Sequence, residues 1–389
     1  MPRKAIFTNA NTSTLIEDGR SWNFHEESTQ EHLHTLHPYP AKFIPQIPRR
    51  AINEWSSKND LIYDPFCGCG TTLLEASLLG RRSIGTDNNA VAVLVSRAKT
   101  YLYDEEVISE IEKFVDGFEE ALAKASCRRE LIPTSKNFGY WFSDEILLRL
   151  SALKGLIVDT KEPLKTLLLA CFSSIIVRVS YQDSDTRYAR IERPIEVAAV
   201  SKAFKAKIIE AVKSLKEIAT QVRSSSIVKQ ADSRSVPFID SESVSLIVTS
   251  PPYLNAYDYH KYHRQRLHWI DGDVAFARDL EIGSHDEFTR PKATPDQYFV
   301  DMEQCFSEWG RVLKAKGKCL VLIGDAIVTK QPVGVADRFI DIASKFNLVL
   351  ESRWIRELKS TKRAFNVANS RMSHEHVLLF EKRLKRKKS

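Results

Sequence analysis

Short apolar runs that end in turn or acidic residues recur along the chain, and they predict the strands of a sheet. These runs are rich in β-branched residues and too short for helices, so each reads as a buried strand. They occur at 60–64, 82–87, 227–232, 245–248 and 318–323. Two further runs, 348–355 and 374–382, predict a closing hairpin. Helical spacing at 47–55 and 333–346 adds helices between strands, so the chain is predicted to be an α/β protein.

The middle of the chain follows a different pattern, in which apolar residues recur at helical spacing and little reads as a strand. The segments with this spacing are 105–125, 145–156, 164–179 and 194–222. Residues 101–226 therefore predict a helical insertion between the second and third strands of the sheet. Its polar connector, 181–190, mixes aromatic, amide and arginine side chains. That mixture suits either contact with bases and phosphates or an ordinary surface loop.

The same patterns divide the chain into parts. Residues 1–30 are polar and weakly patterned, and they predict a loose N-terminal arm. The sheet domain is expected to comprise residues 31–100 and 227–382, with the helical insertion 101–226 between them. Residues 383–389 form a basic tail.

Charge is distributed unevenly. The chain has 389 residues, 43% of them hydrophobic, which is enough for one large domain or two ordinary ones. Its net charge is +7, and six of these charges lie between Lys382 and Lys388. The remainder is nearly neutral, so local basic patches would have to bind any nucleic acid. The tail adds phosphate attraction, or it is only a solvated terminus.

Cysteine usage and hydropathy limit the class of protein further. The six cysteines are scattered, and the one-residue spacing of Cys67 and Cys69 is not a zinc pattern, so no metal is expected. Reduced, mostly buried thiols in a cytosolic protein are the simplest interpretation. No secretory signal is evident. The longest apolar run, 166–177, is twelve residues, too short to span a bilayer. We therefore expect a cytoplasmic protein without a membrane partner.

Two prolines follow directly after the strand predicted at 245–248. The sequence Ser250-Pro251-Pro252-Tyr253 cannot continue the ladder, so the chain leaves the sheet along a rigid, extended path. Ser250 Oγ and the Pro251 carbonyl can accept hydrogen bonds from an exocyclic amine, and Tyr253 can stack on a ring. The segment therefore predicts a clamp for a flat, polar ring.

A glycine-containing turn follows the first predicted strand, between Asp64 and Thr72. Gly68 and Gly70 let a ligand approach the backbone closely. Asp87 ends the next strand, where an acid can bind ribose hydroxyls. The glycine spacing lacks the full dinucleotide fingerprint and no Walker lysine follows, which disfavours NAD and ATP.

Together these segments resemble the DNA amino-methyltransferases that use S-adenosylmethionine. Residues 64–72 match the cofactor motif of that family, and residues 250–253 match its catalytic motif. Residues 37–43 resemble the segment that precedes the cofactor strand, and residues 374–381 resemble the last strand. The resemblance covers about 30–100 and 228–382. It implies a Rossmann-like class I methyltransferase fold, a mixed, mostly parallel seven-stranded sheet with helices on both faces, interrupted here by a helical insertion.

The resemblance also implies site residues. We expect S-adenosylmethionine as cofactor and Ser250, Pro251, Pro252 and Tyr253 as catalytic residues. The expected cofactor-binding residues are His37, Tyr39, Lys42, Asp64, Pro65, Phe66, Gly68, Gly70, Thr71, Thr72, Asp87, Asn88 and Asp232. Basic and aromatic side chains in polar segments are the candidates for DNA contact. These are Arg187, Arg190, Tyr257, Lys261, Arg264 and Arg371.

The serine at position 250 resembles the branch of the family that methylates the N4 amine of cytosine in a specific duplex sequence. The implied partners are double-stranded DNA, whose target base is flipped out, and a cognate restriction endonuclease. The resemblance also implies that a prokaryote or a phage encodes the protein. Adenine-N6 methylation, RNA guanine-N2 methylation and a non-catalytic DNA-binding subunit are the alternatives. The insertion 101–226 and the strand-poor segment 254–297 compete for the role of target recognition.

Overall fold

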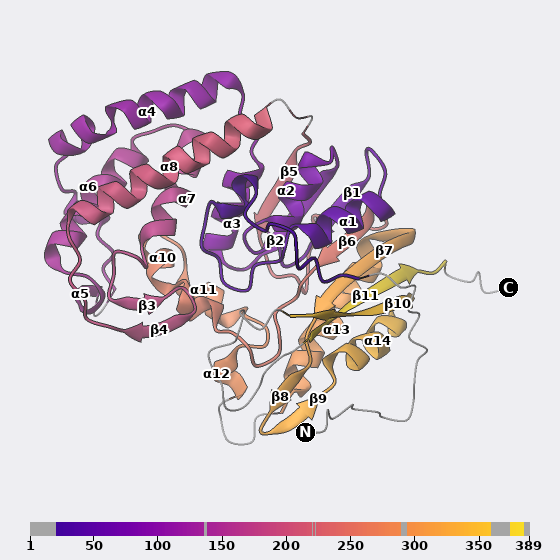
Figure 1. Cartoon of the computed structure of the whole chain (residues 1–389). Coiled ribbons are helices and arrows are strands. Elements are labelled where there is room, and N and C mark those ends of the chain that lie inside the picture. The colour runs from indigo at the N-terminus through magenta and orange to yellow at the C-terminus, as the bar shows by residue number, and fades with distance from the viewer. Residues whose placement is uncertain are drawn as a thin grey trace.

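A computed structural model describes residues 21–135, 138–219, 221, 223–288, 294–358 and 374–384. Its centre is a seven-stranded sheet in the order β10-β11-β7-β6-β1-β2-β5 (Figure 1). The strands are β1 (Leu61–Asp64), β2 (Arg82–Asp87), β5 (Ser226–Gln230), β6 (Val244–Thr249), β7 (Leu313–Ile323), β10 (Leu348–Glu357) and β11 (His374–Lys382). The five strands from β7 to β5 pair in parallel, whereas β11 is antiparallel to both of its neighbours. The predicted strands, including the closing hairpin, are confirmed.

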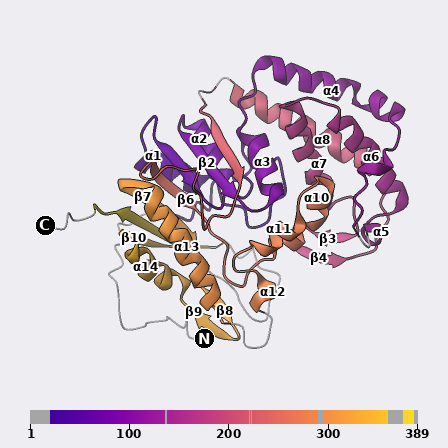
Figure 2. The same cartoon turned by 180° about the vertical axis from the view of Figure 1, so that it is seen from behind.

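Alternation along the central strands separates the two faces of the sheet. On one face, Ile62 and Leu246 pack with the helices α1 (Gln46–Trp55) and α2 (Thr71–Leu78). On the other face, Tyr63 and Ile247 pack with α13 (Asp296–Val312) and α14 (Val335–Lys345). Another helix, α3 (Ala90–Thr100), follows β2. Figure 2 views the molecule from behind and shows the side of the sheet on which α13 and α14 lie. Both faces are covered, as expected for a largely parallel sheet.

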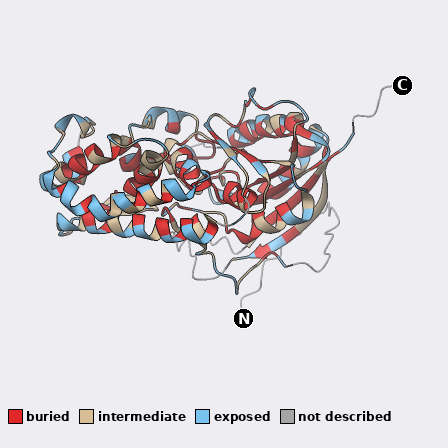
Figure 3. Cartoon of the chain, turned by 90° about the horizontal axis from the view of Figure 1, so that it is seen from above, coloured by how far each residue is buried: buried red, intermediate tan, exposed pale blue. Residues whose placement is uncertain are grey.

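The predicted helical insertion is confirmed between β2 and β5. Its helices are α4 (Glu105–Lys124), η2 (Arg129–Leu131), α5 (Phe138–Trp141), α6 (Asp144–Val158), α7 (Leu164–Ile175) and α8 (Ala198–Ala219). Figure 3 shows buried and exposed residues alternating along these helices. The polar connector 181–190 contains two strands that were not predicted, because β3 (Gln182–Ser184) and β4 (Arg187–Arg190) form a small antiparallel hairpin.

The insertion and the sheet domain share one hydrophobic core. The largest cluster runs through α4, α6, α7 and α8, and it also contains Leu33, Leu36, Leu74, Ala98 and Trp269 from outside the insertion. The first two of these residues lie in and just after η1 (His32–Thr35). The insertion is therefore packed into the sheet domain over a continuous apolar interior.

The described part of the expected N-terminal arm is packed against the sheet domain. Trp22 is fully buried, and its ring centroid lies 6.1 Å from that of Trp55 and 5.4 Å from that of Trp354.

The segment expected to be strand-poor, 254–297, contains short helices. They are α9 (Tyr259–Tyr262), α10 (Arg264–Trp269), α11 (Val274–Asp279) and α12 (His285–Phe288). A small hairpin, β8 (Ala326–Val328) with β9 (Gln331–Val333), follows β7. None of the helices among the described residues is long and apolar enough to cross a membrane.

Candidate active site

A cavity opens at the carboxyl ends of the parallel strands, where α/β sheets bind their ligands. Counted with its open mouth, its empty volume is about 860 Å³. It is bordered by the ends of β1, β2, β5 and β6, by the segment 39–43 and by residues 280–282. The strand order therefore brings the ends of four strands to one site, and the other two segments complete its border.

The turn after β1 forms one wall of the cavity. Asp64 Oδ1 accepts hydrogen bonds from the Phe66 N–H (3.1 Å) and from Thr249 Oγ1 (2.8 Å), which ties the ends of β1 and β6 together. Gly68 has a φ of +48°, and a β-carbon there would lie 3.4 Å from the Tyr39 ring. Glycine is therefore favoured at position 68, because a residue with a side chain would be strained at this φ and would place its β-carbon against the Tyr39 ring.

Asp87 at the end of β2 braces the same turn. Its Oδ2 accepts the Gly68 N–H and its Oδ1 accepts the Asn89 N–H, both at 2.9 Å. Burial raises the pKa of both Asp64 and Asp87 to about 6, against the hydrogen bonds that favour their ionised forms. Two carboxylates thus face one cavity at neutral pH.

The predicted cofactor residues divide into two groups. Those that line the cavity are Tyr39, Lys42, Asp64, Phe66, Gly68, Thr71, Asp87, Asn88 and Asp232. Those that are not part of its lining are His37, Pro65, Gly70 and Thr72. The Pro65 carbonyl accepts from Thr86 Oγ1 (3.0 Å), and Thr72 Oγ1 donates to the Val248 carbonyl (3.4 Å). Gly70 is the N-cap of α2 with a φ of +76°. Pro65, Gly70 and Thr72 therefore fix the backbone of the turn and are not part of the cavity lining.

His37 joins the site to the insertion. Its Nε2 lies 3.1 Å from Ser173 Oγ on α7, and its ring lies beside Tyr39 and His263. Burial, with Arg266 nearby, lowers the pKa of His37 well below its usual value, so the ring is neutral. Arg266 is itself fully buried, donates to the Ser173 carbonyl (3.0 Å) and pairs with Asp185 of the hairpin region.

The predicted catalytic segment lies directly after β6, at the mouth of the cavity. Ser250 and Pro252 line the cavity, and the Pro252 carbonyl accepts a hydrogen bond from Tyr298 Oη (2.9 Å). Tyr253 is half-buried, and its hydroxyl lies 3.5 Å from Ser250 Oγ. The same hydroxyl donates to Glu375 Oε1 on β11 at 2.9 Å. The segment is therefore held from both sides.

Several residues at the site were not predicted from the sequence. Glu281 lines the cavity and accepts the backbone N–H groups of Tyr259 (2.7 Å) and His260 (2.9 Å). Tyr259 also lines the cavity. Glu375 touches the catalytic segment through Tyr253, and its Oε2 pairs with Arg356 of β10. No local motif marks Glu281 or Glu375, because their partners are distant in the chain.

The candidate DNA-contacting residues lie around the rim and on the insertion. Arg187 is exposed and pairs with Asp183 (3.2 Å). The Arg190 guanidinium stacks on the rings of Tyr140 (4.7 Å) and Tyr181 (4.8 Å). Arg264 is exposed and borders a second cavity of about 530 Å³. That cavity is lined by Ser135, Phe138, Tyr140, Trp141, Tyr188, Arg264, Gln265 and His268.

The remaining candidates have acidic or aromatic neighbours. Lys261 is held between Asp258 (3.5 Å) and Asp286. The Tyr257 ring lies 5.5 Å from that of Tyr259. Arg371 lies outside the described residues.

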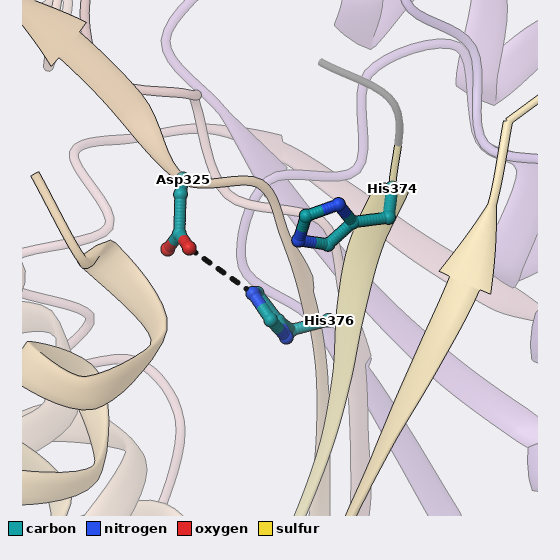
Figure 4. A group of neighbouring side chains, drawn as sticks. All are labelled: Asp325, His374 and His376. Carbon is teal, nitrogen blue, oxygen red and sulfur yellow. Dashed lines mark hydrogen bonds and ion pairs between the residues drawn. The ribbon is translucent and has the colours of Figure 1, made fainter. Parts of the chain in front are cut away.

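Asp325, His374 and His376 gather at the same edge of the sheet, where β11 begins (Figure 4). His376 Nε2 lies 3.2 Å from Asp325 Oδ2, as the dashed line shows. Arg353 Nε–H points at His376 Nδ1 (3.4 Å), and this donor requires Nδ1 to be the acceptor. Nε2 therefore carries the ring proton and donates it to Asp325. His376 is therefore bonded through both ring nitrogens, and the His374 ring lies 5.2 Å from its ring.

The residues of the cavity at the carboxyl ends of the strands fit a nucleoside cofactor that carries a positive charge. An acid at the end of β2 suits ribose hydroxyls, and the glycine turn allows close approach. The carboxylates of Asp64 and Asp87 suit a sulfonium. With the order β10-β11-β7-β6-β1-β2-β5 and the single reversed strand β11, the chain has the Rossmann-like class I methyltransferase fold.

Comparison with known proteins identifies the family. Residues 8–97 and 244–389 match the family model of the N6/N4 enzymes described as DNA methylase. The type II methyltransferase M.MvaI of Kocuria varians is 25% identical over 282 residues, which cover 67% of this chain and 62% of that protein. M.MjaII of Methanocaldococcus jannaschii is 21% identical over 77% of this chain and 73% of its own. This chain therefore belongs to the DNA methylase family, and S-adenosylmethionine is its cofactor.

Among solved structures, a SAM-dependent methyltransferase from Methanosarcina mazei matches 86% of this chain and 97% of its own. It is 10% identical, with a TM-score of 0.36. The family model leaves residues 98–243 unmatched, and this range contains the whole helical insertion.

Proposed function

We propose that this chain transfers a methyl group from S-adenosylmethionine to the N4 amine of cytosine in a specific duplex sequence. The observation that carries the proposal is the Ser250–Tyr253 segment, which leaves β6 at the mouth of the cofactor cavity with Ser250 in its lining. The family model covers both N4 and N6 methylation, and the serine favours the N4 branch.

The chemistry asks little of the protein beyond positioning. The bound cofactor supplies a methyl group that is already activated on a sulfonium. Ser250 Oγ and the Pro251 carbonyl would accept the two amine hydrogens, which favours a pyramidal nitrogen and stabilises its charge as it develops. Because the nucleophile is the amine itself, no covalent intermediate with the protein is required. Alignment of the amine with the methyl group is then the main contribution of the site.

A base inside a duplex cannot reach this cavity, so we infer that the target cytosine is flipped out. Flipping costs roughly a few kcal/mol, which stacking on Tyr253 would partly offset. We assign the positioning of the duplex to Arg187, Arg190, Tyr257, Lys261 and Arg264, with Arg371 from the segment outside the described residues. Arg190 and Arg264 lie beside the aromatic second cavity, so they combine a cation with stacking surfaces.

Adenine-N6 methylation is the second candidate, because the matched family includes it. The setting that fits either activity is DNA marking, with a cognate restriction endonuclease as partner. The expected location is the cytoplasm, where DNA of a prokaryote or a phage is accessible.

Mass spectrometry of nucleosides tests the proposal. Amplified, unmodified genomic DNA is incubated with the protein and S-adenosylmethionine and then digested. We expect N4-methylcytosine; N6-methyladenine alone would overturn the base assignment, and no methylated nucleoside would overturn the activity. Ser250→Ala should lower turnover by roughly tenfold or more, and it should lower turnover by more than it lowers cofactor affinity. Ser245→Ala, at the opposite end of β6, is the matched control, because Ser245 Oγ bonds to Asp60 and Lys314 there, away from the cavity.

A further inference from the structure

A line of hydroxyl and carboxyl groups leads from the catalytic segment into the sheet. Ser250 Oγ lies 3.5 Å from Tyr253 Oη, and Tyr253 Oη lies 2.9 Å from Glu375 Oε1. Glu375 Oε2 is paired with the Arg356 guanidinium, and both residues are buried. The line therefore starts at the cavity wall and ends at a charged pair on β10 and β11.

The chemistry of these groups fixes the direction of the hydrogen bonds. Arg356 can only donate, and a carboxylate can only accept, so the Tyr253 hydrogen must point to Glu375. Tyr253 Oη is then an acceptor toward Ser250, and the Ser250 hydrogen points away from the cavity. The lone pairs of Ser250 Oγ are left for a donor in the cavity. The serine is thus presented as an acceptor for an amine, and its hydrogen is not offered to a ring nitrogen.

We propose that Ser250, Tyr253 and Glu375 form a proton relay, with Glu375 as the terminal acceptor of the proton that the methylated amine releases. The proposal rests on the proposed methyl transfer to an exocyclic amine. Glu375 does not touch the substrate; it acts through Tyr253, so it is a positioning residue that also stores the proton. The 3.5 Å step is long for a hydrogen bond, as is usual before substrate binds, and it should shorten in the complex.

The steps balance in atoms and charge. As the carbon–nitrogen bond forms, the sulfur–carbon bond breaks and the positive charge moves to the amine nitrogen. The nitrogen–hydrogen bond then breaks, and its proton joins Ser250 Oγ. The Ser250 proton passes to Tyr253 Oη, and the Tyr253 proton passes to Glu375 Oε1. Glu375 ends as a neutral acid and later loses the proton to solvent, and the two hydroxyl hydrogens rotate back.

The test measures single-turnover methyl transfer, so that product release does not hide the chemical step. Labelled S-adenosylmethionine is used with amplified, unmodified genomic DNA. The variants are Glu375→Gln, Glu375→Ala and Tyr253→Phe, and Tyr253→Phe leaves the Glu375–Arg356 pair intact. Glu381→Gln is the matched control, because Glu381 lies on the same strand and pairs with Lys318 (2.6 Å) away from the catalytic segment.

We expect Glu375→Gln and Tyr253→Phe to lower the single-turnover rate by roughly a hundredfold, the usual contribution of a proton-transfer group. Cofactor affinity should stay within twofold of wild type, and Glu381→Gln should match wild type in both. Formate should partly restore the rate of Glu375→Ala, relative to an equal concentration of chloride, since a carboxylate is regained beside Arg356. A merely structural glutamate would not respond to formate.

Rates within twofold of wild type for Tyr253→Phe would overturn the relay, and this variant decides alone if the Glu375 variants do not fold. Slow Glu375→Ala with no response to formate would also overturn it. If the wild-type protein methylates no DNA, the proposed function fails and the relay fails with it. If wild type is active and the variants are equally active, only the relay fails.

Discussion

Replacing Asp87 with alanine should weaken cofactor binding and also loosen the glycine turn. The carboxylate accepts two backbone N–H groups at 2.9 Å, from Gly68 and Asn89. Each buried N–H left without an acceptor costs about 1–3 kcal/mol. Because Asp87 lines an open cavity, water can replace part of this bonding, so we expect a loss of about 2 kcal/mol in the free energy of unfolding.

The effect on the cofactor comes in addition. Hydrogen bonds to a charged group contribute about 1.5–3 kcal/mol, so losing the bonds from the ribose should weaken the dissociation constant by about 10- to 150-fold. Calorimetric titration with S-adenosylmethionine measures the affinity, and thermal unfolding measures the stability. Asp159→Ala is the control, because Asp159 is exposed and pairs with Arg128 on the insertion. An unchanged dissociation constant with a lower melting temperature would show that Asp87 only braces the turn, and no change in either would refute the reasoning.

Further measurements test other parts of the structure. Burial raises the pKa of Asp64 and Asp87 to about 6, so cofactor affinity, which needs their ionised forms, should fall as titrations move from pH 7 to pH 5. The same shifts mean that the stability these groups contribute is present at low pH and lost as the pH rises through about 6, which urea unfolding would reveal. Deleting Leu384–Ser389 should lower affinity for random duplex and flatten its salt dependence, without a comparable loss of turnover; an unchanged salt slope would mark the tail as a solvated end. Gly70→Ala should cost about 1–3 kcal/mol more in urea unfolding than Gly80→Ala, because both have positive φ but only at Gly70 would a β-carbon meet a neighbouring side chain, at 2.7 Å; equal costs would contradict this.

The parts of the fold that follow from local pattern could be predicted from the sequence. The strand at 245–248 and the two prolines after it place the catalytic segment at a sheet edge, and the turn after 60–64 places the glycines beside it. The four long helices of the insertion follow from their apolar spacing. In each case the signal lies within about twenty consecutive residues.

The remainder depends on partners that are far apart in the chain. The hairpin at 182–190 is polar and short, and its strands lack the apolar alternation that marks a half-buried strand. Glu375 meets Tyr253 across 122 positions. His37 bonds to Ser173, which lies 136 positions further along the chain. The sequence suggested that His37 contacts the cofactor, whereas the structure shows it in contact with a helix of the insertion. Patterns in neighbouring residues cannot predict contacts of this kind, because the contacts arise from the order of the strands in the sheet.

The shared core has a consequence for engineering. Enzymes that recognise DNA are often considered as a catalytic unit plus an exchangeable reader. Here the apolar interior of the insertion includes Leu33, Leu36, Leu74 and Trp269 of the surrounding chain, and Arg266 is buried against the Ser173 carbonyl. A foreign segment grafted between β2 and β5 would leave these side chains without their neighbours. If the chain acts on a specific DNA sequence as proposed, a change of that sequence is therefore better sought by substituting exposed side chains on an unchanged scaffold than by exchanging the segment as a cassette.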